Sequence, residues 1–162
     1  MKVLKRNWFE FVHEPKSVLF WTGNLSVTNK GKAVMGRGLA KQVLEKYPGI
    51  DVELGQQLSE ISTKEIKQDL YGNKVVIKNA CLILVRNKIG MFPVKFGWWE
   101  QANLNLIAVS CKGLSEMAAR NKSFNFYVNY PGIGAGMLKE VDVEVILNKY
   151  LIGENVFVLK GE

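Results

Sequence analysis

The sequence predicts an α/β fold in which a largely buried central sheet carries helices on both faces. Short apolar runs typical of buried strands alternate along the chain with longer segments whose apolar residues recur at helical spacing. Two glycine-rich segments lie where strands lead into helices, which is where such folds bind ligands. The 162 residues fit one domain, residues 1–162, that can bury a core without disulfides or metals.

The first half of the chain predicts a strand and a helix around the first glycine-rich segment. Residues 18–21 form an apolar run that ends in the Thr-Gly-Asn sequence of residues 22–24, as expected for a buried strand and a turn. Apolar residues recur at helical spacing over residues 39–47, and the Pro-Gly pair at 48–49 stops the pattern. Residues 51–68 are polar and mixed, and we expect a short helix and a connector there.

The second half predicts further strands and helices. Residues 75–77 and 81–85 read as two strands that either pair as a hairpin or are joined by a tight step at residues 78–80. Residues 91–99 are crowded with aromatics and predict a loop, and residues 98–117 suit a long helix. The remaining predicted elements are a strand at 124–128, a helix at 141–150 and a strand at 156–159.

The two glycine-rich segments, Met-Gly-Arg-Gly-Leu-Ala at 35–40 and Pro-Gly-Ile-Gly-Ala-Gly at 131–136, are the main functional signal. Glycines let the backbone approach a ligand closely, and the first turn of a following helix offers unpaired N–H groups and a positive dipole end. Each segment therefore suits an anion. Two of them in one small domain predict a ligand with two linked phosphates, held from both sides.

Other phosphate-binding classes fit less well. The first segment lies a dozen residues past the preceding strand, unlike a dinucleotide fingerprint, and it lacks the lysine and hydroxyl residue of a P-loop. The formal net charge of +7 favours phosphate-bearing partners, and a transient nucleic-acid contact is one of them. The basic residues form no run of five or more, so the usual basic tail of nucleic-acid-binding proteins is missing.

Metal, cofactor and membrane functions are not expected. Cys81 and Cys111 read as reduced core thiols, and together with His13, the single histidine, they are too few for a zinc site. His13 is expected in a loop without a catalytic role. No apolar run is long enough to span a bilayer and no signal peptide is evident, so we expect a soluble cytoplasmic protein.

In order and spacing, four segments resemble the macrodomain family, which binds ADP-ribose. They are residues 22–25 (Thr-Gly-Asn-Leu), 33–42 (Ala-Val-Met-Gly-Arg-Gly-Leu-Ala-Lys-Gln), 92–95 (Phe-Pro-Val-Lys) before a Trp-rich segment, and 131–136. The resemblance extends from about residue 17 to 160. It is strongest to the branch that contains the terminal ADP-ribose glycohydrolase and the antitoxin that removes ADP-ribose from DNA.

The resemblance implies a three-layer α/β/α fold with a mixed central sheet and a cleft for ADP-ribose, whose diphosphate lies between the two glycine segments. Asn24 stands where these proteins usually have an aspartate that accepts a hydrogen bond from the adenine amino group; its amide oxygen could accept the same bond without charge assistance. The implied ligand-binding residues are Gly23, Asn24, Leu25, Met35, Gly36, Arg37, Gly38, Leu39, Pro131, Gly132, Ile133, Gly134, Ala135, Gly136 and Met137.

The resemblance also implies chemistry at Lys95, which matches a lysine that attacks the anomeric carbon of the distal ribose. The amine must be neutral to attack, and an aromatic surrounding from Phe92, Phe96, Trp98 and Trp99 could lower its pKa by desolvation. The aspartate expected after the last glycine of the second segment is replaced here by the Met-Leu pair at 137–138. Glu140 and Asp142 are the nearest carboxylates, as candidate acid or base or as charges that complement a helix dipole.

Three functions remain open from the sequence alone. The first is removal of ADP-ribose from a modified macromolecule through Lys95. Removal of phosphate from ADP-ribose 1''-phosphate, for which Asn29, Asn129 and Tyr130 are candidate polar groups, is the alternative chemistry for such an enzyme. The second is binding of ADP-ribose without turnover. The third is a nucleic-acid-binding module whose glycines only shape turns.

Overall fold

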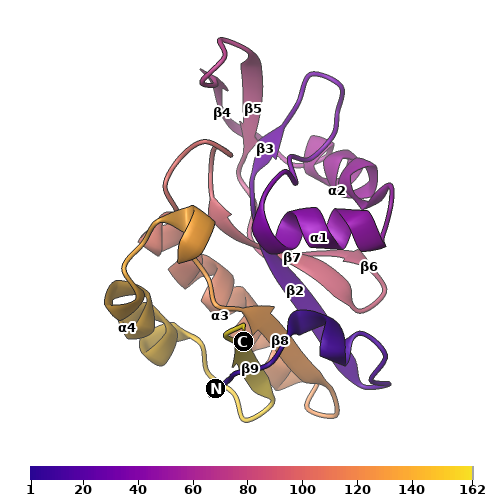
Figure 1. Cartoon of the computed structure of the whole chain (residues 1–162), viewed down its shortest axis with the longest axis vertical. Helices are drawn as coiled ribbons and strands as arrows, with labels where there is room; N and C mark the ends of the chain where they lie inside the picture. Colours follow the sequence, from indigo (N-terminus) through magenta and orange to yellow (C-terminus); the bar gives the residue numbers. More distant parts are fainter. Residues whose placement is uncertain (162) are drawn as a thin grey trace.

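The computed structural model describes residues 1–161 and has two sheets (Figure 1). The larger sheet has six strands in the order β1-β9-β8-β2-β7-β6, parallel except for the β6–β7 pair, so it is mixed as expected. Its strands are β1 (Lys2–Leu4), β2 (Ser17–Asn24), β6 (Ile83–Arg86), β7 (Ile89–Lys95), β8 (Asn125–Asn129) and β9 (Val156–Leu159). The smaller sheet is antiparallel, in the order β3-β5-β4, with β3 (Ser26–Val27), β4 (Thr63–Gln68) and β5 (Lys74–Lys78).

Helices cover both faces of the larger sheet. The helices are η1 (Trp8–Phe11), α1 (Gly38–Lys46), α2 (Ile50–Ser59), α3 (Leu104–Arg120), η2 (Gly134–Gly136) and α4 (Glu140–Tyr150). One apolar cluster packs β2 against η1, α1 and α2, and a second packs β2 against α3 and α4. Alternate residues of β2 serve the two clusters, since Leu19 and Trp21 belong to the first and Phe20 to the second. The expected three-layer α/β/α arrangement is therefore present.

Several predicted elements match the structure closely. The strands expected at 18–21, 124–128 and 156–159 are β2, β8 and β9, and the helices expected at 39–47 and 141–150 are α1 and α4. The short helix expected in residues 51–68 is α2, but the expected connector contains β4, an edge strand of the smaller sheet. Its residues are exposed or only partly buried, and most of them are polar, so its sequence lacks the apolar pattern typical of a strand.

The strands expected at 75–77 and 81–85 are β5 and β6, but their expected pairing and the loop expected at 91–99 are wrong. Residues 75–77 and 81–85 do not pair with each other, because β5 belongs to the smaller sheet and β6 pairs antiparallel with β7. Residues 91–95, expected in a loop, form most of β7, a buried strand between β2 and β6. Pro93 is tolerated there because β6 begins at Ile83, opposite Met91, so the ladder between β6 and β7 does not reach Pro93.

Two helix starts also differ from the prediction. The long helix begins at Leu104 rather than near residue 98, because the Asn103 side chain accepts the Leu106 N–H at 3.0 Å and caps it. The second glycine segment does not open a long helix. It forms only the three-residue turn η2, which ends at Met137 in the left-handed region with φ 60°, and α4 starts at Glu140.

The cysteine prediction is half wrong, because Cys111 is buried but Cys81 is exposed. Burial raises the pKa of the Cys111 thiol to about 12. Across residues 1–161, no helix has the length and apolar character needed to span a membrane, and no three His, Cys, Asp or Glu side chains gather where they could hold a metal ion.

Candidate functional site

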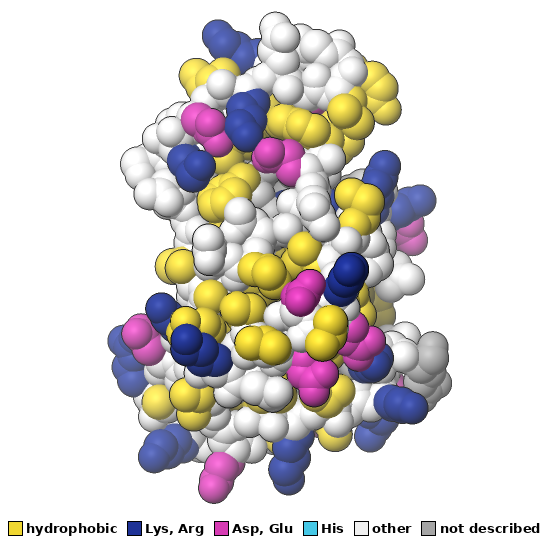
Figure 2. Space-filling model, turned by 90° about the vertical axis from the view of Figure 1, so that its left-hand side faces the viewer, with side chains coloured by type: hydrophobic (Ala, Val, Ile, Leu, Met, Phe, Trp, Pro, Cys, Tyr) yellow, Lys and Arg dark blue, Asp and Glu magenta, His cyan; other side chains and the backbone are white. Residues whose placement is uncertain are grey.

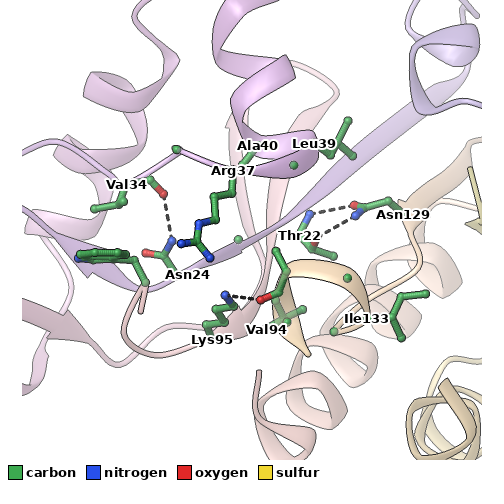
Figure 3. Close-up of a pocket in the computed structure, with 18 of the residues that line it drawn as sticks. Thr22, Asn24, Val34, Arg37, Leu39, Ala40, Val94, Lys95, Asn129 and Ile133 are labelled. Atoms are coloured by element: carbon green, nitrogen blue, oxygen red, sulfur yellow. Dashed lines mark hydrogen bonds between the residues drawn. The ribbon is translucent and has the colours of Figure 1, made fainter. Parts of the chain in front are cut away.

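A cleft of about 540 Å³ opens where β2 and β7 end, between the start of α1 and the second glycine segment (Figure 3). Its charged lining residues are Arg37 and Lys95, and none of the aspartates and glutamates among residues 1–161 lines it. The remaining lining is mostly glycine backbone and apolar side chains. This combination of positive charge and accessible backbone suits an anionic ligand.

The first glycine segment presents the N-terminus of α1 to the cleft. Arg37 is the N-cap residue, with extended backbone at φ −142° and ψ 155°, and no side chain caps the helix. The first N–H groups of α1 therefore have no acceptor within the helix. A Cβ added at Gly36 or Gly38 would meet no atom within 4 Å, and Gly38 has a positive φ of 56°. Both glycines thus face open space at the cleft.

The second glycine segment forms the opposite wall. Gly134 also has open space at its Cβ position and a positive φ of 66°. Gly132 and Gly136 serve packing instead, because a Cβ at Gly132 would lie 2.8 Å from the Ile107 side chain and one at Gly136 would lie 3.0 Å from Ala102. The segment can therefore be anchored at its two ends while its middle faces a ligand.

Lys95, at the end of β7, projects its amine between the two glycine segments (Figure 3). Its Nζ donates a 2.9 Å hydrogen bond to the Ala135 carbonyl, and the residue is 9% exposed. Burial, followed by the nearby positive charge of Arg37, holds the pKa of Lys95 below its ordinary value. Among residues 1–161 no carboxylate forms an ion pair with Lys95.

The aromatic surrounding expected for Lys95 is mostly located elsewhere. Trp98 lines the cleft, but Phe92 is fully buried in the cluster under α3 and α4. Phe96 and Trp99 pack against the cluster on the other face. The cleft walls, including Ala135, account for the burial of the amine instead.

Polar side chains connect the ends of β2 and β8 to the cleft. The Asn24 Nδ2 donates to the Val34 carbonyl at 3.0 Å, and its Oδ1 accepts the Ser26 N–H at 3.0 Å, so this side chain ties β2 to the loop before α1. The Asn129 amide pairs with Thr22 in the same way, through the Thr22 N–H and hydroxyl. One lone pair of the Asn24 Oδ1 remains for the base contact that the sequence predicts.

The structure gathers most of the predicted ligand residues in this cleft. Those that line it are Gly23, Asn24, Gly36, Arg37, Gly38, Leu39, Lys95, Gly132, Ile133, Gly134, Ala135 and Gly136. Leu25, Met35 and Pro131 are buried beside it and do not line it, and Met137 is 63% exposed outside it. Among the phosphatase candidates only Asn129 lines the cleft.

The two candidate carboxylates lie outside the cleft. Glu140 forms an ion pair with Lys160, and Asp142 is exposed on the first turn of α4. Both positions complement the dipole of α4, the alternative that the sequence left open. His13 lies exposed in a turn, outside the cleft.

Sequence reasoning did not single out Tyr71 as a site residue. It lies on the β4–β5 turn, lines the cleft and stacks with Trp98, with ring centroids 6.1 Å apart. No local motif marks a tyrosine on a hairpin turn as a cleft residue, because its position depends on how the smaller sheet packs. Thr22, Val34, Ala40 and Val94 were missed for the same reason: their roles depend on the tertiary fold.

Comparisons with protein-family models and with curated proteins find no match, but solved structures match over nearly the whole chain. The macrodomain of Mycobacterium tuberculosis DarG is 19% identical, with a TM-score of 0.60 over 99% of this chain and 95% of that one. The macrodomain of Thermus aquaticus DarG is 18% identical, with a TM-score of 0.59 over 99% and 97%. Thermosipho africanus DarTG in complex with ADP-ribose is 18% identical, with a TM-score of 0.65 over 98% of this chain and 40% of that one.

The layers, the sheet order and the cleft define a three-layer α/β/α protein with a positively charged cleft at the strand ends. More particularly, the chain has the macrodomain fold.

Proposed function

We propose that this chain binds ADP-ribose and removes it from a modified macromolecule, with Lys95 as the nucleophile. The observation that carries the proposal is the partly buried Lys95 amine between two glycine segments, in a cleft that no carboxylate of residues 1–161 lines. A solved DarTG structure with this fold is a complex with ADP-ribose, which supports the choice of ligand.

Binding would rest on the diphosphate. The uncapped first turn of α1 and the backbone around Gly134 offer N–H donors from opposite sides, and Arg37 adds a positive charge. Two backbone anion sites acting on one diphosphate support micromolar affinity or better, roughly 8 kcal/mol. Asn24 would then accept from the adenine amino group with the free lone pair of its amide oxygen.

Catalysis would use the neutral form of Lys95. Its Nζ attacks the anomeric carbon of the distal ribose, the bond from that carbon to the carrier breaks, and the leaving group takes up the proton that Nζ releases. Water then cleaves the bond between carbon and Nζ, which frees ADP-ribose and the amine. The lowered pKa of Lys95 increases the fraction of neutral amine available for this attack.

A second candidate is a reader that binds ADP-ribose without turnover, which is favoured because no carboxylate of the described residues lines the cleft. Neither Glu140 nor Asp142 reaches it, so no acidic side chain there is ready to move a proton. The phosphatase alternative has less support, because two of its three candidate polar groups, Asn29 and Tyr130, do not line the cleft. A transient nucleic-acid contact through the basic surface remains a proposal.

Two measurements test the proposed function. Calorimetric titration with ADP-ribose, AMP and single-stranded DNA should give tight binding only for ADP-ribose; a preference for DNA would support the nucleic-acid module instead. Release of ADP-ribose should then be assayed from ADP-ribosylated DNA and ADP-ribosylated glutamate peptides, and of phosphate from ADP-ribose 1''-phosphate. Binding of ADP-ribose without release of product from any of these three substrates would support the reader function instead.

A further inference from the structure

The smaller sheet projects beyond the larger one and ends in the β4–β5 turn (Figure 1). In the space-filling view, hydrophobic side chains are exposed on this projecting part beside lysines and acidic residues (Figure 2). Three apolar side chains of this hairpin are largely exposed: Ile66, Leu70 and Tyr71 at 55%, 68% and 78%. Of these three only Tyr71 also lines the cleft.

Tyr71 has a fixed position although its side chain is exposed. The Asp69 Oδ1 accepts the N–H groups of Tyr71 at 2.8 Å and of Asn73 at 2.9 Å, which holds the turn in one conformation. The Tyr71 ring lies nearly parallel to that of Trp98, with an interplanar angle of 21°. The two rings come from segments far apart in the sequence and together form one wall of the cleft.

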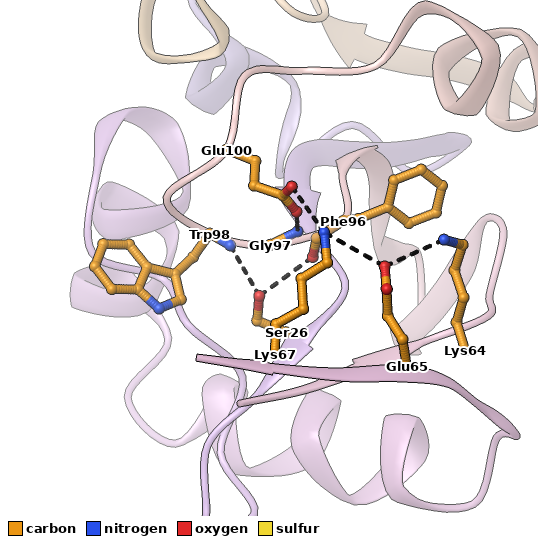
Figure 4. A network of polar contacts seen from close by, with 8 residues as sticks. All are labelled: Ser26, Lys64, Glu65, Lys67, Phe96, Gly97, Trp98 and Glu100. Atoms are coloured by element: carbon orange, nitrogen blue, oxygen red, sulfur yellow. Dashed lines mark hydrogen bonds and ion pairs between the residues drawn. The ribbon is translucent and has the colours of Figure 1, made fainter. Parts of the chain in front are cut away.

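Hydrogen bonds fix the backbone of Trp98. The backbone N–H of Trp98 donates to the Ser26 Oγ at 2.9 Å. The Ser26 hydroxyl in turn donates to the Phe96 carbonyl at 3.2 Å (Figure 4). Ser26 also donates its N–H to Asn24, so Trp98 lies at the Asn24 side of the cleft. The Glu100 carboxylate accepts the Gly97 N–H at 2.8 Å and fixes the same loop.

The hairpin is attached to this loop by polar contacts along β4. Lys67 pairs with Glu100 at 3.0 Å and with Glu65 at 3.4 Å, and the Lys64 amine lies 4.5 Å from the centre of the Phe96 ring (Figure 4). The Lys67–Glu100 pair, the Lys64–Phe96 contact and the Tyr71–Trp98 stack join β4 and its turn to residues 96–100. They hold the hairpin over one end of the cleft.

We propose that Tyr71 and Trp98 form a stacking platform for a planar heteroaromatic ring of the ligand, and that the Lys67–Glu100 pair is its positioning contact. This inference rests on the proposed ADP-ribose function and adds a specificity determinant to the same cleft. Two preoriented aromatic rings offer a flat apolar surface, and a base that stacks on such a surface gains affinity without losing hydrogen bonds. The smaller sheet is then part of the ligand site.

Such a ring could come from two parts of the ligand. It is either the adenine of ADP-ribose or a ring attached to the anomeric carbon of the distal ribose. Three probes separate these sources: ADP, ADP-ribose, and nicotinamide adenine dinucleotide, which carries a second ring on that carbon. An effect on all three ligands identifies adenine, whereas an effect on the dinucleotide alone identifies the attached ring.

The test compares dissociation constants of variants of the whole chain by calorimetry. Tyr71→Ala should weaken binding about 5- to 100-fold for the ligands whose ring stacks, from the usual strength of base–aromatic stacking. Tyr71→Phe keeps the ring and should stay within about twofold. Leu70→Ala is the matched control, because it removes an exposed apolar side chain from the same turn outside the cleft.

The positioning role of Lys67 is tested by a double-mutant cycle. Lys67→Gln should weaken ring-dependent binding in the unmodified protein and have no effect in the Tyr71→Ala background, because it acts through the platform. Equal effects in both backgrounds would overturn this part of the proposal.

The remaining outcomes are separable. If the unmodified protein binds the probes and Tyr71→Ala binds all three within twofold of it, the platform is overturned while the proposed function stands. If Tyr71→Phe loses as much as Tyr71→Ala, the hydroxyl acts and stacking is overturned. If the unmodified protein binds none of the three, the proposed function and the platform are both overturned.

Discussion

At the scale of single residues, Lys95 combines two properties that rarely occur together on a protein surface. It has an uncharged hydrogen-bond acceptor, the Ala135 carbonyl, and a positive neighbour, Arg37. Most surface lysines instead keep their charge in water or pair it with a carboxylate. Its environment therefore favours the neutral amine, which can act as a nucleophile.

Lys95→Ala is expected to abolish release of ADP-ribose and to retain most of the affinity for it. A nucleophile acts on the reaction path, whereas affinity would come mainly from the glycine segments, so rate and binding should separate. Lys95→Arg keeps the positive charge but stays protonated at working pH, and should be equally inactive. Single-turnover assays and calorimetry measure the two effects. Full activity of Lys95→Arg would exclude Lys95 as nucleophile.

A matched control for these variants is Lys41→Ala. Lys41 is an exposed lysine of α1 that does not line the cleft, so its removal changes the net charge equally. It should leave the release rate within about twofold, as surface substitutions usually do.

The lowered pKa of Lys95 predicts a pH dependence of both rate and stability. The release rate should rise with pH and reach its plateau at a pH below the ordinary lysine pKa of about 10.4. Between the folded-state pKa and that value the unfolded chain binds more protons, so the free energy of unfolding should rise with pH relative to Lys95→Met, which lacks the group. Urea unfolding at pH 7 and pH 9.5 measures the difference. A free energy of unfolding that falls with pH relative to that of Lys95→Met would contradict the lowered pKa.

At the scale of elements, the start of α1 and the turn η2 differ in what they can offer a ligand. Helix α1 is nine residues long and has no side-chain cap, so it presents unpaired N–H groups together with a helix dipole. Turn η2 has three residues and offers only its local backbone. The glycines of the second segment therefore matter for close approach more than for any dipole.

Gly134→Glu is expected to abolish ADP-ribose binding. An added side chain has open space there, so it would occupy the cleft itself, and its carboxylate would repel the diphosphate. Gly49→Glu is the control, because Gly49 also has a positive φ and open space but lies outside the cleft, before α2. Calorimetry should show no binding for the first variant and ordinary binding for the second. Equal affinities would exclude the second segment as a phosphate site.

Element positions could be predicted from the sequence where local patterning dominates. Strand β9 and helices α1 and α4 have clear apolar periods, and Pro48 ends the α1 pattern. Strand β7 was missed because its proline and aromatic residues resemble a loop. Only the structure shows that the β6–β7 ladder stops at Met91, which allows a proline at position 93 of the strand. Strand β4 was missed because it pairs with β5 at the edge of the smaller sheet and its mostly polar side chains do not pack into a core.

The glycines of the cleft could be predicted because backbone access is a property of the residue type, whereas Lys95 was indicated only by the resemblance of residues 92–95 to the macrodomain family. The contribution of Tyr71 follows from packing between distant segments and has no local signature. Placing Glu140 and Asp142 outside the cleft likewise required the path of the chain after η2.

At the scale of the whole molecule, the cleft lies between two packed halves. One apolar cluster holds η1, α1 and α2 on one face of the larger sheet, and the other holds α3 and α4 on the opposite face. The first glycine segment belongs to the former half and the second to the latter. A ligand held by both segments would therefore join the halves and stabilise the native state as a whole.

Thermal unfolding should detect this stabilisation. At a ligand concentration 100 times the dissociation constant, binding adds about 2.7 kcal/mol to the free energy of unfolding. For a chain of this size each kcal/mol raises Tm by roughly 2–4 °C, so ADP-ribose at about 0.1 mM should raise Tm by about 5–10 °C if its affinity is micromolar. AMP has one phosphate and should raise Tm less, and Gly134→Glu should show no rise with ADP-ribose. Because Arg37 and the helix dipole attract the diphosphate electrostatically, added salt should reduce the shift. An unchanged Tm at millimolar ADP-ribose would contradict binding between the two halves.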